Sequence, residues 1–375
     1  MEQTEKNSKH IKKSKEYHRF KNRLFFIQLI INFVLLIAFM LSGFSLALKN
    51  FSFQYSENFL IGNGIYIMAV AVIMYILHFP LNFVEGFTWE HRFNLSNQKF
   101  IHWLRDDVKK ASLGLVVTVL MVEVIYVLLR RFPDSWWMGA TFFWLLLNLV
   151  LARLMPNALI PLFYKYSDIE NEQLKVRILE LFKKCKVKIK NAYAINFSSK
   201  TNKANAFVCG LGNNRRVVLS DNLLHKFTDE EIETVVAHEL GHYKNHDIIK
   251  ITLVASYVTF LSFYMIDVFL KKALVWFQLE RIDDIAFFPM LAAAFLVLNL
   301  FVMPALNAFS RRLEREADIF SMKTTGKPKS LASAFRKLGD VNLAEFEPNK
   351  FIEIFLYDHP PLAQRIKFVE NFPLT

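Results

Sequence analysis

The sequence has 375 residues, of which 53% are hydrophobic and 21% charged, and its mean hydropathy of +0.24 excludes an ordinary soluble enzyme. Its formal net charge is +12, but no nucleic-acid motif and no interleaving of arginine with aromatic residues accompanies that charge. We therefore attribute the basic excess to segments that meet anionic lipid and expect no nucleic-acid partner.

Six apolar runs approach the length of about 20 residues with which a helix crosses a bilayer. Any one of them could be a buried core helix, and this alternative is most credible for the fifth. Six such runs in one chain nevertheless indicate a polytopic membrane protein. The runs cover residues 24–48, 60–82, 111–129, 136–162, 251–270 and 285–308.

The placement of lysine and arginine predicts the orientation of these runs. Residues 1–23 contain eight lysines and arginines and are too charged for a cleaved signal peptide, so we place them in the cytoplasm. An even number of spans then returns the other basic segments to the same side, whereas the loops 49–58 and 130–135 are short. The predicted organisation is a basic N-terminus (1–23), membrane helices (24–162) with a cytoplasmic interfacial segment (83–110), a cytoplasmic domain (163–250), further membrane helices (251–308) and a cytoplasmic C-terminal segment (309–375).

Several charged residues fall close to or within the membrane. Aromatic and charged residues crowd the boundary at 80–94, and residues 100–110 resemble an amphipathic helix lying on the membrane before the third span. Ionisable side chains at membrane depth normally face a partner or a water-filled space. Glu123 and Arg153 could form such a pair, or Arg153 and Asp267 could extend towards an interface, and the sequence leaves both alternatives open.

The segment 163–250 has the pattern of a small α+β domain. A polar helix is expected at about 171–186, and β-branched alternation predicts short strands at Val187–Phe197 and Arg216–Leu219. The extended segment 205–212 between them could bind a peptide by strand addition, or it could be a plain hairpin. Cys185 and Cys209 lack metal-ligand spacing, and disulfides are rare in the cytoplasm, so both are expected to be packing residues.

A H-E-x-x-H motif, His238-Glu239-Leu240-Gly241-His242, follows these strands. Thr228 and Glu231 form the pattern of a capping box at the start of a helix. Residues i and i+4 share one face of a helix, so His238 and His242 can bind one zinc ion. Glu239 lies beside the metal and can take the proton from a water that zinc activates for attack on a peptide carbonyl. Chance occurrence on an amphipathic helix is the alternative.

A second segment supplies the third protein ligand that a catalytic zinc needs. Glu314 and Asp318 are spaced i and i+4, so one carboxylate can bind the metal while the other orients a ligand histidine. Glu316 falls on another face and is expected to be a solvated charge. Further on, a polar helix is expected near 329–339, and two prolines follow His359 and precede Arg365, which could reach the site and stabilise an oxyanion.

These motifs together resemble the type I CAAX prenyl endopeptidases, integral-membrane zinc proteases that cut after the prenylated cysteine of a C-terminal CAAX motif. The resemblance covers nearly the whole chain beyond the basic N-terminus. Its motifs are Glu90–Asn94, Pro161–Phe163, Asn205–Phe207, His238–His242, Ser310–Arg312 with Glu314, Ala317–Asp318 and His359–Leu362 with Arg365.

The resemblance implies a predominantly α-helical polytopic protein with six or seven membrane helices around an internal chamber, and a small α+β cytoplasmic zinc metalloprotease domain. It also implies roles for single residues: one Zn²⁺ held by His238, His242 and Glu314, Glu239 as general base, Asp318 behind a ligand, His359 and Arg365 near the substrate, and Asn205, Ala206 and Phe207 as peptide contacts. Eukaryotic members carry a histidine at the position of Lys203, a long acidic insertion before the zinc helix and commonly seven spans, whereas this chain shows six. An additional span could lie in 111–162.

The sequence therefore predicts a membrane-embedded zinc endopeptidase that cuts near the C-terminus of prenylated or other membrane-associated peptides. Its expected partners are a peptide or protein substrate and the lipid bilayer. A heat-shock-type protease that degrades damaged membrane proteins is the alternative with the same chemistry, and a metal-dependent transporter or chaperone is the alternative of another class. The compact loops favour a bacterial inner membrane over the endoplasmic reticulum, with the active site towards the cytoplasm.

Overall fold

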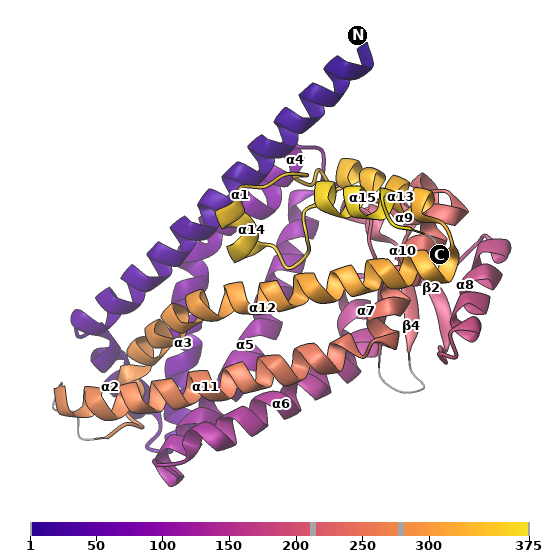
Figure 1. The fold of residues 1–375 in the computed structure, drawn as a ribbon. Helices are drawn as coiled ribbons and strands as arrows, with labels where there is room; N and C mark the ends of the chain where they lie inside the picture. The colour runs from indigo at the N-terminus through magenta and orange to yellow at the C-terminus, as the bar shows by residue number, and fades with distance from the viewer. Residues whose placement is uncertain (1, 211–214, 277–280, 374–375) are drawn as a thin grey trace.

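The computed structural model describes residues 2–210, 215–276 and 281–373 (Figure 1). The α-helices are α1 (Glu2–Leu41), α2 (Phe44–Tyr55), α3 (Phe59–Phe83), α4 (Glu90–Arg92), α5 (Phe100–Arg131), α6 (Trp136–Leu154), α7 (Ile160–Phe163), α8 (Glu172–Lys184), α9 (Asp221–Lys226), α10 (Asp229–Lys244), α11 (Asp247–Trp276), α12 (Phe288–Thr325), α13 (Pro328–Val341), α14 (Lys350–Leu356) and α15 (Leu362–Glu370). The strands are β1 (Tyr166–Asp168), β2 (Asn191–Ile195), β3 (Ala206–Cys209) and β4 (Arg216–Ser220).

Among the described residues, six helical segments are long and apolar enough to cross a membrane, which agrees with the predicted number. They are His10–Leu41, Phe59–Arg92, Phe100–Arg131, Trp136–Phe163, Asp247–Ala273 and Ile285–Thr325. The fifth is not a soluble core helix, because Leu253 and Tyr257 on α11 are 63% and 64% exposed. Large apolar side chains that remain exposed in this way are suited to contact with lipid.

Two predicted boundaries were wrong. The first span does not reach residue 48, because Gly43 adopts a left-handed conformation (φ 75°) and separates α1 from α2, which occupies most of the predicted loop 49–58. Residues 100–110 do not form a separate interfacial helix, because α5 continues without a break from Phe100 to Arg131. The segment 111–162 contains only the two expected spans among the described residues, so the additional helix of this half is α2.

The membrane helices form a closed ring. Around it, α1 contacts α12, α12 contacts α11, α11 contacts α6, α6 contacts α5, α5 contacts α3, α3 contacts α2, and α2 returns to α1. Figure 1 shows the two long helices α11 and α12 in front, with α5 passing behind them. A ring of this kind encloses an interior that side chains from several helices can share.

Among the described residues, Glu123 and Arg153 of this ring do not form the suggested pair. Arg153 is exposed, and the described residues contain no ion pair between it and Glu123, whose Oε2 atom is buried without a hydrogen-bond partner among them. Asp267 remains a candidate for the suggested extension towards an interface. It is 3% exposed, lies 3.0 Å from Lys271 Nζ and accepts a 2.8 Å hydrogen bond from Trp136 Nε1.

The small domain contains a four-stranded sheet in the order β1-β2-β4-β3, with β2 and β4 parallel and the outer pairs antiparallel. The helix expected at 171–186 is α8, the strands expected at 187–197 and 216–219 are β2 and β4, and the helix expected at 329–339 is α13. Strand β1 was not expected. Helices α8 and α10 bury one face of the sheet around Ile178, Val217 and Val236, all less than 1% exposed. Cys185 packs against this core, and both cysteines are free.

Helix α12 connects the two parts of the molecule. It begins in the membrane and continues without interruption to Thr325, so its last turns pack against α10 in the small domain (Figure 1). The acidic residues at 314 and 318 lie on these last turns and are 5% and 1% exposed. A membrane helix therefore delivers two buried carboxylates to the face of the H-E-x-x-H helix.

Candidate active site

Helix α10 begins with the predicted capping box. Glu231 N donates to Thr228 Oγ1 at 3.3 Å, and Thr228 N donates to Glu231 Oε2 at 2.8 Å, so two backbone groups at the helix start are paired. Lys337 on α13 contacts the same carboxylate at 2.7 Å. These contacts fix the start of α10, and two turns later the helix presents His238 and His242 on the face that meets α12.

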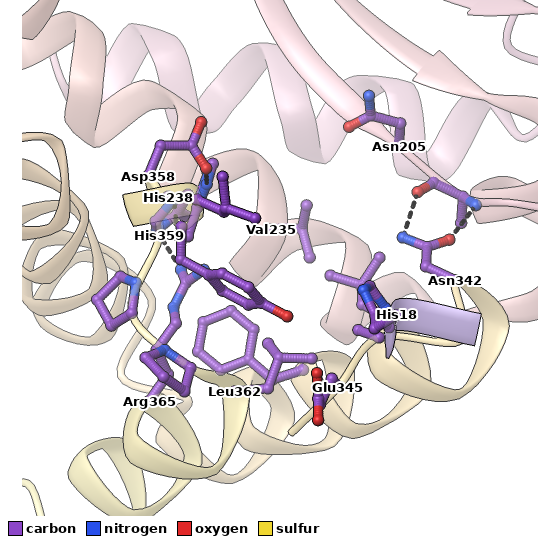
Figure 2. A pocket seen from close by; sticks show the side chains of 18 of the residues that line it. His18, Asn205, Val235, His238, Asn342, Glu345, Asp358, His359, Leu362 and Arg365 are labelled. Carbon is purple, nitrogen blue, oxygen red and sulfur yellow. Dashed lines mark hydrogen bonds and ion pairs between the residues drawn. The ribbon is translucent and has the colours of Figure 1, made fainter. Parts of the chain in front are cut away.

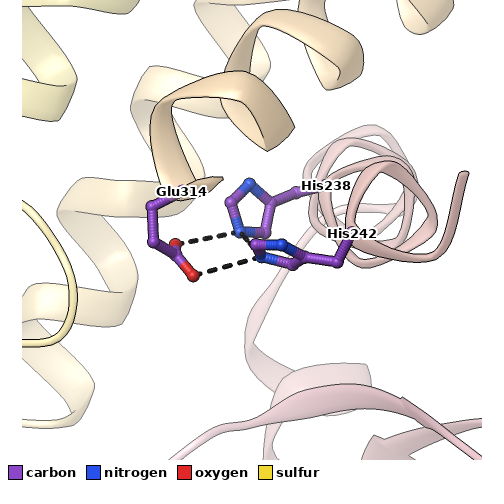
Figure 3. A group of neighbouring side chains, drawn as sticks. All are labelled: His238, His242 and Glu314. Carbon is purple, nitrogen blue, oxygen red and sulfur yellow. Dashed lines mark hydrogen bonds and ion pairs between the residues drawn. The ribbon is translucent and has the colours of Figure 1, made fainter. Parts of the chain in front are cut away.

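His238, His242 and Glu314 form a compact group of potential metal ligands (Figure 3). The His238 Nε2 and His242 Nε2 atoms are 3.2 Å apart, and the Glu314 carboxylate oxygens lie 3.2 Å from the first and 3.1 Å from the second. Two ligand atoms of a tetrahedral zinc site, each about 2.0–2.1 Å from the metal, are separated by about 3.3 Å. The two imidazoles and the carboxylate thus fit zinc in both chemistry and spacing.

The close approach of α10 and α12 requires Gly241. A Cβ atom at this position would lie 3.2 Å from the Ala317 Cα and 3.2 Å from the Phe320 Cβ, which is tighter than most real contacts. Any side chain here would therefore push α12 away from α10. Because Glu314 lies one turn before Ala317 on α12, the glycine within the motif allows the third ligand to reach the histidines.

A carboxylate lies behind each histidine. His238 Nδ1 is 2.9 Å from Asp318 Oδ1, and His242 Nδ1 is 3.0 Å from Asp247 Oδ2. Both acids are 1% exposed. Carboxylates in this position hold the proton on Nδ1 and leave the Nε2 lone pair for a metal. Asp318 was predicted for this place, whereas Asp247 was missed. Burial lowers the pKa of His238, but its contacts with Asp318 and Glu314 outweigh burial and raise the pKa to about 9.

Arg365 reaches the site, but two of its guanidinium nitrogens are already hydrogen-bonded there. Its Nε and Nη2 atoms donate to the two oxygens of Asp318 at 3.0 and 2.6 Å, and its guanidinium lies 4.1 Å from the ring centroid of Phe335. The side chain is 8% exposed. Nε and Nη2 thus fix the carboxylate behind His238, while Nη1 lies 3.5 Å from Glu314 Oε2, so the suggested contact of Arg365 with an oxyanion stays a prediction.

His359 does reach the metal-ligand group. Its Nε2 atom is 3.1 Å from Glu314 Oε1, and its Nδ1 atom is 2.7 Å from Asp358, which the sequence had not indicated as a partner. Burial lowers the pKa of His359, but the hydrogen bonds to Asp358 and Glu314 outweigh burial and raise the pKa to about 10. The imidazole remains 52% exposed and lies at the edge of a cavity. It can contact a ligand held there.

That cavity has a volume of about 540 Å³ and lies between α10, the residues before β3, α1 and the C-terminal segment (Figure 2). Glu239 lines it and makes no hydrogen bond or ion pair with the described residues. Burial raises the pKa of the Glu239 carboxyl group above its usual range. An available carboxylate next to the metal ligands is the arrangement that a general base requires.

The opposite wall of the cavity contains Asn205 and Ala206. Asn342, which the sequence analysis missed, donates to Ala204 O at 3.0 Å and accepts from Ala204 N at 2.8 Å, and thereby fixes the chain before β3 (Figure 2). Phe207 is not among the residues that line the cavity, so its predicted contact with a peptide stays a prediction. Residues 211 and 212, the end of the segment proposed for strand addition, lie outside the described residues.

Comparison with known proteins agrees with this geometry. Residues 168–372, more than half of the chain, match the family model of peptidase family M48, and residues 3–165 match the family model described as the CAAX prenyl protease N-terminal, five membrane helices. Within residues 3–165 the described part of this chain has four helical segments long and apolar enough to cross a bilayer, and α2, with 12 residues, is too short to be a fifth.

Individual relatives are similar over most of their length. The chain is 31% identical to the uncharacterized metalloprotease YhfN of Bacillus subtilis, over 96% of this chain and 85% of that protein. It is 26% identical to the probable CAAX prenyl protease 1 of Schizosaccharomyces pombe, over 82% of this chain and 65% of that protein. The crystal structure of S. mikatae Ste24p shares the fold, with a TM-score of 0.86 at 21% identity over 96% of this chain and 89% of the other.

These matches favour the protease over a transporter or chaperone, and they agree with a site whose residues fit zinc. The chain therefore belongs to peptidase family M48, as a multi-pass membrane zinc metalloendopeptidase of the type I CAAX prenyl protease family.

Proposed function

We propose that His238, His242 and Glu314 hold the zinc ion and that Glu239 is the general base of peptide hydrolysis. Zinc at this position supplies a Lewis acid that polarises a peptide carbonyl and activates water. The observation that supports these roles is the Glu239 carboxylate, which is unpaired among the described residues and lines the cavity of about 540 Å³ beside the ligand group. Asp318, held by Arg365, keeps His238 oriented, and His359 contacts the substrate at the rim.

The substrate binds as an additional strand along β3. Strand β3 is at the edge of the sheet, and Asn205 O accepts a hydrogen bond from Ser220 N at 2.9 Å. Because backbone groups alternate in direction along an antiparallel strand, the N–H and C=O groups of Val208 and the C=O group of Ala206 point away from β4 and can pair with a peptide, whereas Ala206 N donates to Asn205 Oδ1 at 2.9 Å. Asn205 is exposed within the cavity and can bind the peptide backbone.

The substrate class that suits this site is a membrane-associated peptide cut near its C-terminus, with a prenylated CAAX-type peptide as the first candidate. His18 and Lys21 of α1, at the start of the first membrane span, line the same cavity, so a bound peptide lies next to the membrane. The distribution of lysine and arginine along the chain supports a cytoplasmic position for this side of the molecule. The similarity to a Bacillus subtilis protein favours a bacterial cell membrane.

Cleavage of a quenched fluorescent peptide by the purified, detergent-solubilised protein tests the proposal. The same peptide sequence is offered with and without a farnesyl group on its cysteine, to wild type and to Glu239→Gln, and zinc content is measured on both proteins. We expect wild type alone to cut, at equal zinc content, with a clear preference for the farnesylated form.

The outcomes separate the parts of the proposal. Cleavage by Glu239→Gln at the wild-type rate contradicts the role of the general base. Equal cleavage of both peptides contradicts recognition of the lipid and supports a protease for damaged membrane proteins. Loss of zinc from His238→Ala but not from Asn205→Ala is expected, and the opposite pattern contradicts the ligand assignment.

A further inference from the structure

A second cavity, of about 310 Å³, lies where α12, α14 and α15 meet. It adjoins the cavity of about 540 Å³ beside the metal ligands, called the substrate cavity below, because Pro360 and Arg365 line both cavities. Its wall contains four arginines and two acids: Arg311, Arg312, Arg315, Arg365, Asp318 and Glu353. No role in zinc binding or peptide binding has been assigned to this cavity.

The positive charge in this cavity is only partly compensated. Arg365 and Asp318 compensate each other through their bidentate contact. Arg311 donates to the backbone oxygens of Glu353 and Tyr357 at 3.0 and 2.6 Å, so its guanidinium is held in place by neutral acceptors. A fixed cation that is bonded to carbonyl groups keeps its full charge for a ligand.

The other two arginines are more accessible. Arg312 is 78% exposed, and its contact with Glu316, at 3.5 Å, is at the limit of hydrogen-bond distance. Arg315 makes no ion pair with any described residue and lies 4.6 Å from the ring centroid of Phe368. Three guanidinium groups thus surround the cavity, and of its two wall carboxylates Glu353 has no arginine paired to it among the described residues.

The cavity lies at the level of the membrane surface. Phe351 of α14 packs against Phe26 of α1, which is near the start of the first apolar run, with 6.0 Å between ring centroids. Asn307 Nδ2, at the end of the last apolar run, donates to Phe355 O at 2.6 Å. On α14, Phe351 and Ile354 are 53% and 46% exposed. These contacts place α14 at the boundary between apolar and polar surroundings, with apolar side chains next to the arginines.

We propose that this cavity binds the headgroup of an anionic phospholipid, with the phosphate on Arg311, Arg312 and Arg315 and the acyl chains along the exposed apolar side chains of α14. Arginine binds phosphate by paired N–H donors, and basic pockets at this depth of a membrane protein bind anionic headgroups. A peptide carboxylate fits less well, because the arginine nearest the substrate cavity, Arg365, already has its Nε and Nη2 donors engaged by Asp318.

Lipid binding by the full-length, zinc-loaded protein tests this inference. The assay includes no cleavage step, so failure of the lipid site can be distinguished from failure of the proposed function. The protein in a neutral detergent is titrated with phosphatidylglycerol or phosphatidylcholine, and bound lipid is counted by native mass spectrometry. Because an arginine near a membrane surface contributes about 1 kcal/mol to anionic lipid binding, we expect about fivefold weaker phosphatidylglycerol binding in Arg312→Gln and on the order of 25-fold in Arg312→Gln/Arg315→Gln. Phosphatidylcholine binding should not change.

The matched control is Arg105→Gln/Arg153→Gln. It removes the same charge from exposed positions on α5 and α6, away from the cavity. An equal loss of phosphatidylglycerol binding in this control overturns the inference, because it indicates diffuse attraction. Displacement of the lipid by millimolar inorganic phosphate overturns the assignment to a lipid, and displacement by a tripeptide with a free carboxylate assigns the cavity to the substrate. Arg312→Gln removes a largely exposed side chain, so its zinc content and Tm should remain those of wild type.

Discussion

Replacing Asp247 with alanine should weaken zinc binding by about 10- to 100-fold, the range found when the partner behind a ligand histidine is removed. Asp247 is 1% exposed, and its Oδ2 atom is 3.0 Å from His242 Nδ1. Without it the imidazole can rotate and can place its proton on either nitrogen. In the described part of the chain, no other group is hydrogen-bonded to His242 Nδ1.

The expected loss of zinc affinity has two contributions, the hydrogen bond from Asp247 to His242 and the negative charge of Asp247. Asp247 Oδ1 is 2.9 Å from Lys250 Nζ, so alanine removes both the hydrogen bond to the histidine and the negative charge that balances the lysine. Asparagine keeps an acceptor oxygen near Nδ1 but not the charge. We expect Asp247→Asn to lose about 10-fold and Asp247→Ala up to 100-fold, which corresponds to about 1.4 and 2.7 kcal/mol.

Competition with a fluorescent zinc chelator measures these affinities on the purified protein, and peptide cleavage is not needed. Glu316→Gln is the matched control, because Glu316 also contacts Lys250, at 3.5 Å, but is not bonded to either histidine. Its zinc affinity should be that of wild type. Equal zinc affinity in wild type and Asp247→Ala would refute the reasoning, and equal losses in Asp247→Ala and Glu316→Gln would show that only general electrostatics is involved.

Three further predictions follow from local geometry. Gly241→Ala should lower the free energy of unfolding by about 1–3 kcal/mol, because its Cβ would be 3.2 Å from the α12 backbone. Thermal unfolding measures this change. The control is Gly114→Ala, which should not destabilise the protein because a Cβ at Gly114 has nothing within 4 Å. Asn342→Ala, which removes two hydrogen bonds to the chain before β3, should raise KM for the peptide more than it lowers kcat. Burial raises the pKa of the Cys209 thiol to about 11 and thus disfavours the thiolate; alkylation followed by mass spectrometry should therefore be slow at pH 8 and about tenfold faster per pH unit up to that pKa.

The grouping of His238, His242 and Glu314 could be predicted from the sequence because each position depends on local periodicity. A capping box fixes where α10 begins, and a spacing of four residues then sets the shared face of His238 and His242. The same spacing made Glu314 and Asp318 a matched pair of carboxylates. The six apolar runs could be counted for a related reason, because the bilayer imposes a length on each helix.

Asp247 and Asn342 could not be predicted, because their roles depend on the direction in which the chain continues. His246 has a positive φ of 58°, and this local reversal starts α11 so that Asp247 points back to the site. A sequence pattern does not report such a turn at a residue other than glycine or asparagine. The continuous α5 was missed for a similar reason: the charged residues at its start form no boundary, since Asp107 and Asp106 are paired to Tyr75 and Lys200.

The distance of Glu314 from the end of the last apolar run bears on which substrates can reach the metal ligands. A helix rises 1.5 Å per residue, so Glu314 lies about 9 Å along α12 from residue 308, where the last apolar run ends. The same helix carries Arg311 and Arg312 within that interval, at the level where lipid headgroups are expected. A peptide bond can therefore reach the metal ligands while the residue a few positions away remains at the membrane surface. This short distance favours a substrate that is anchored in the membrane close to its cleavage site, because a soluble polypeptide gains nothing from a site at this depth.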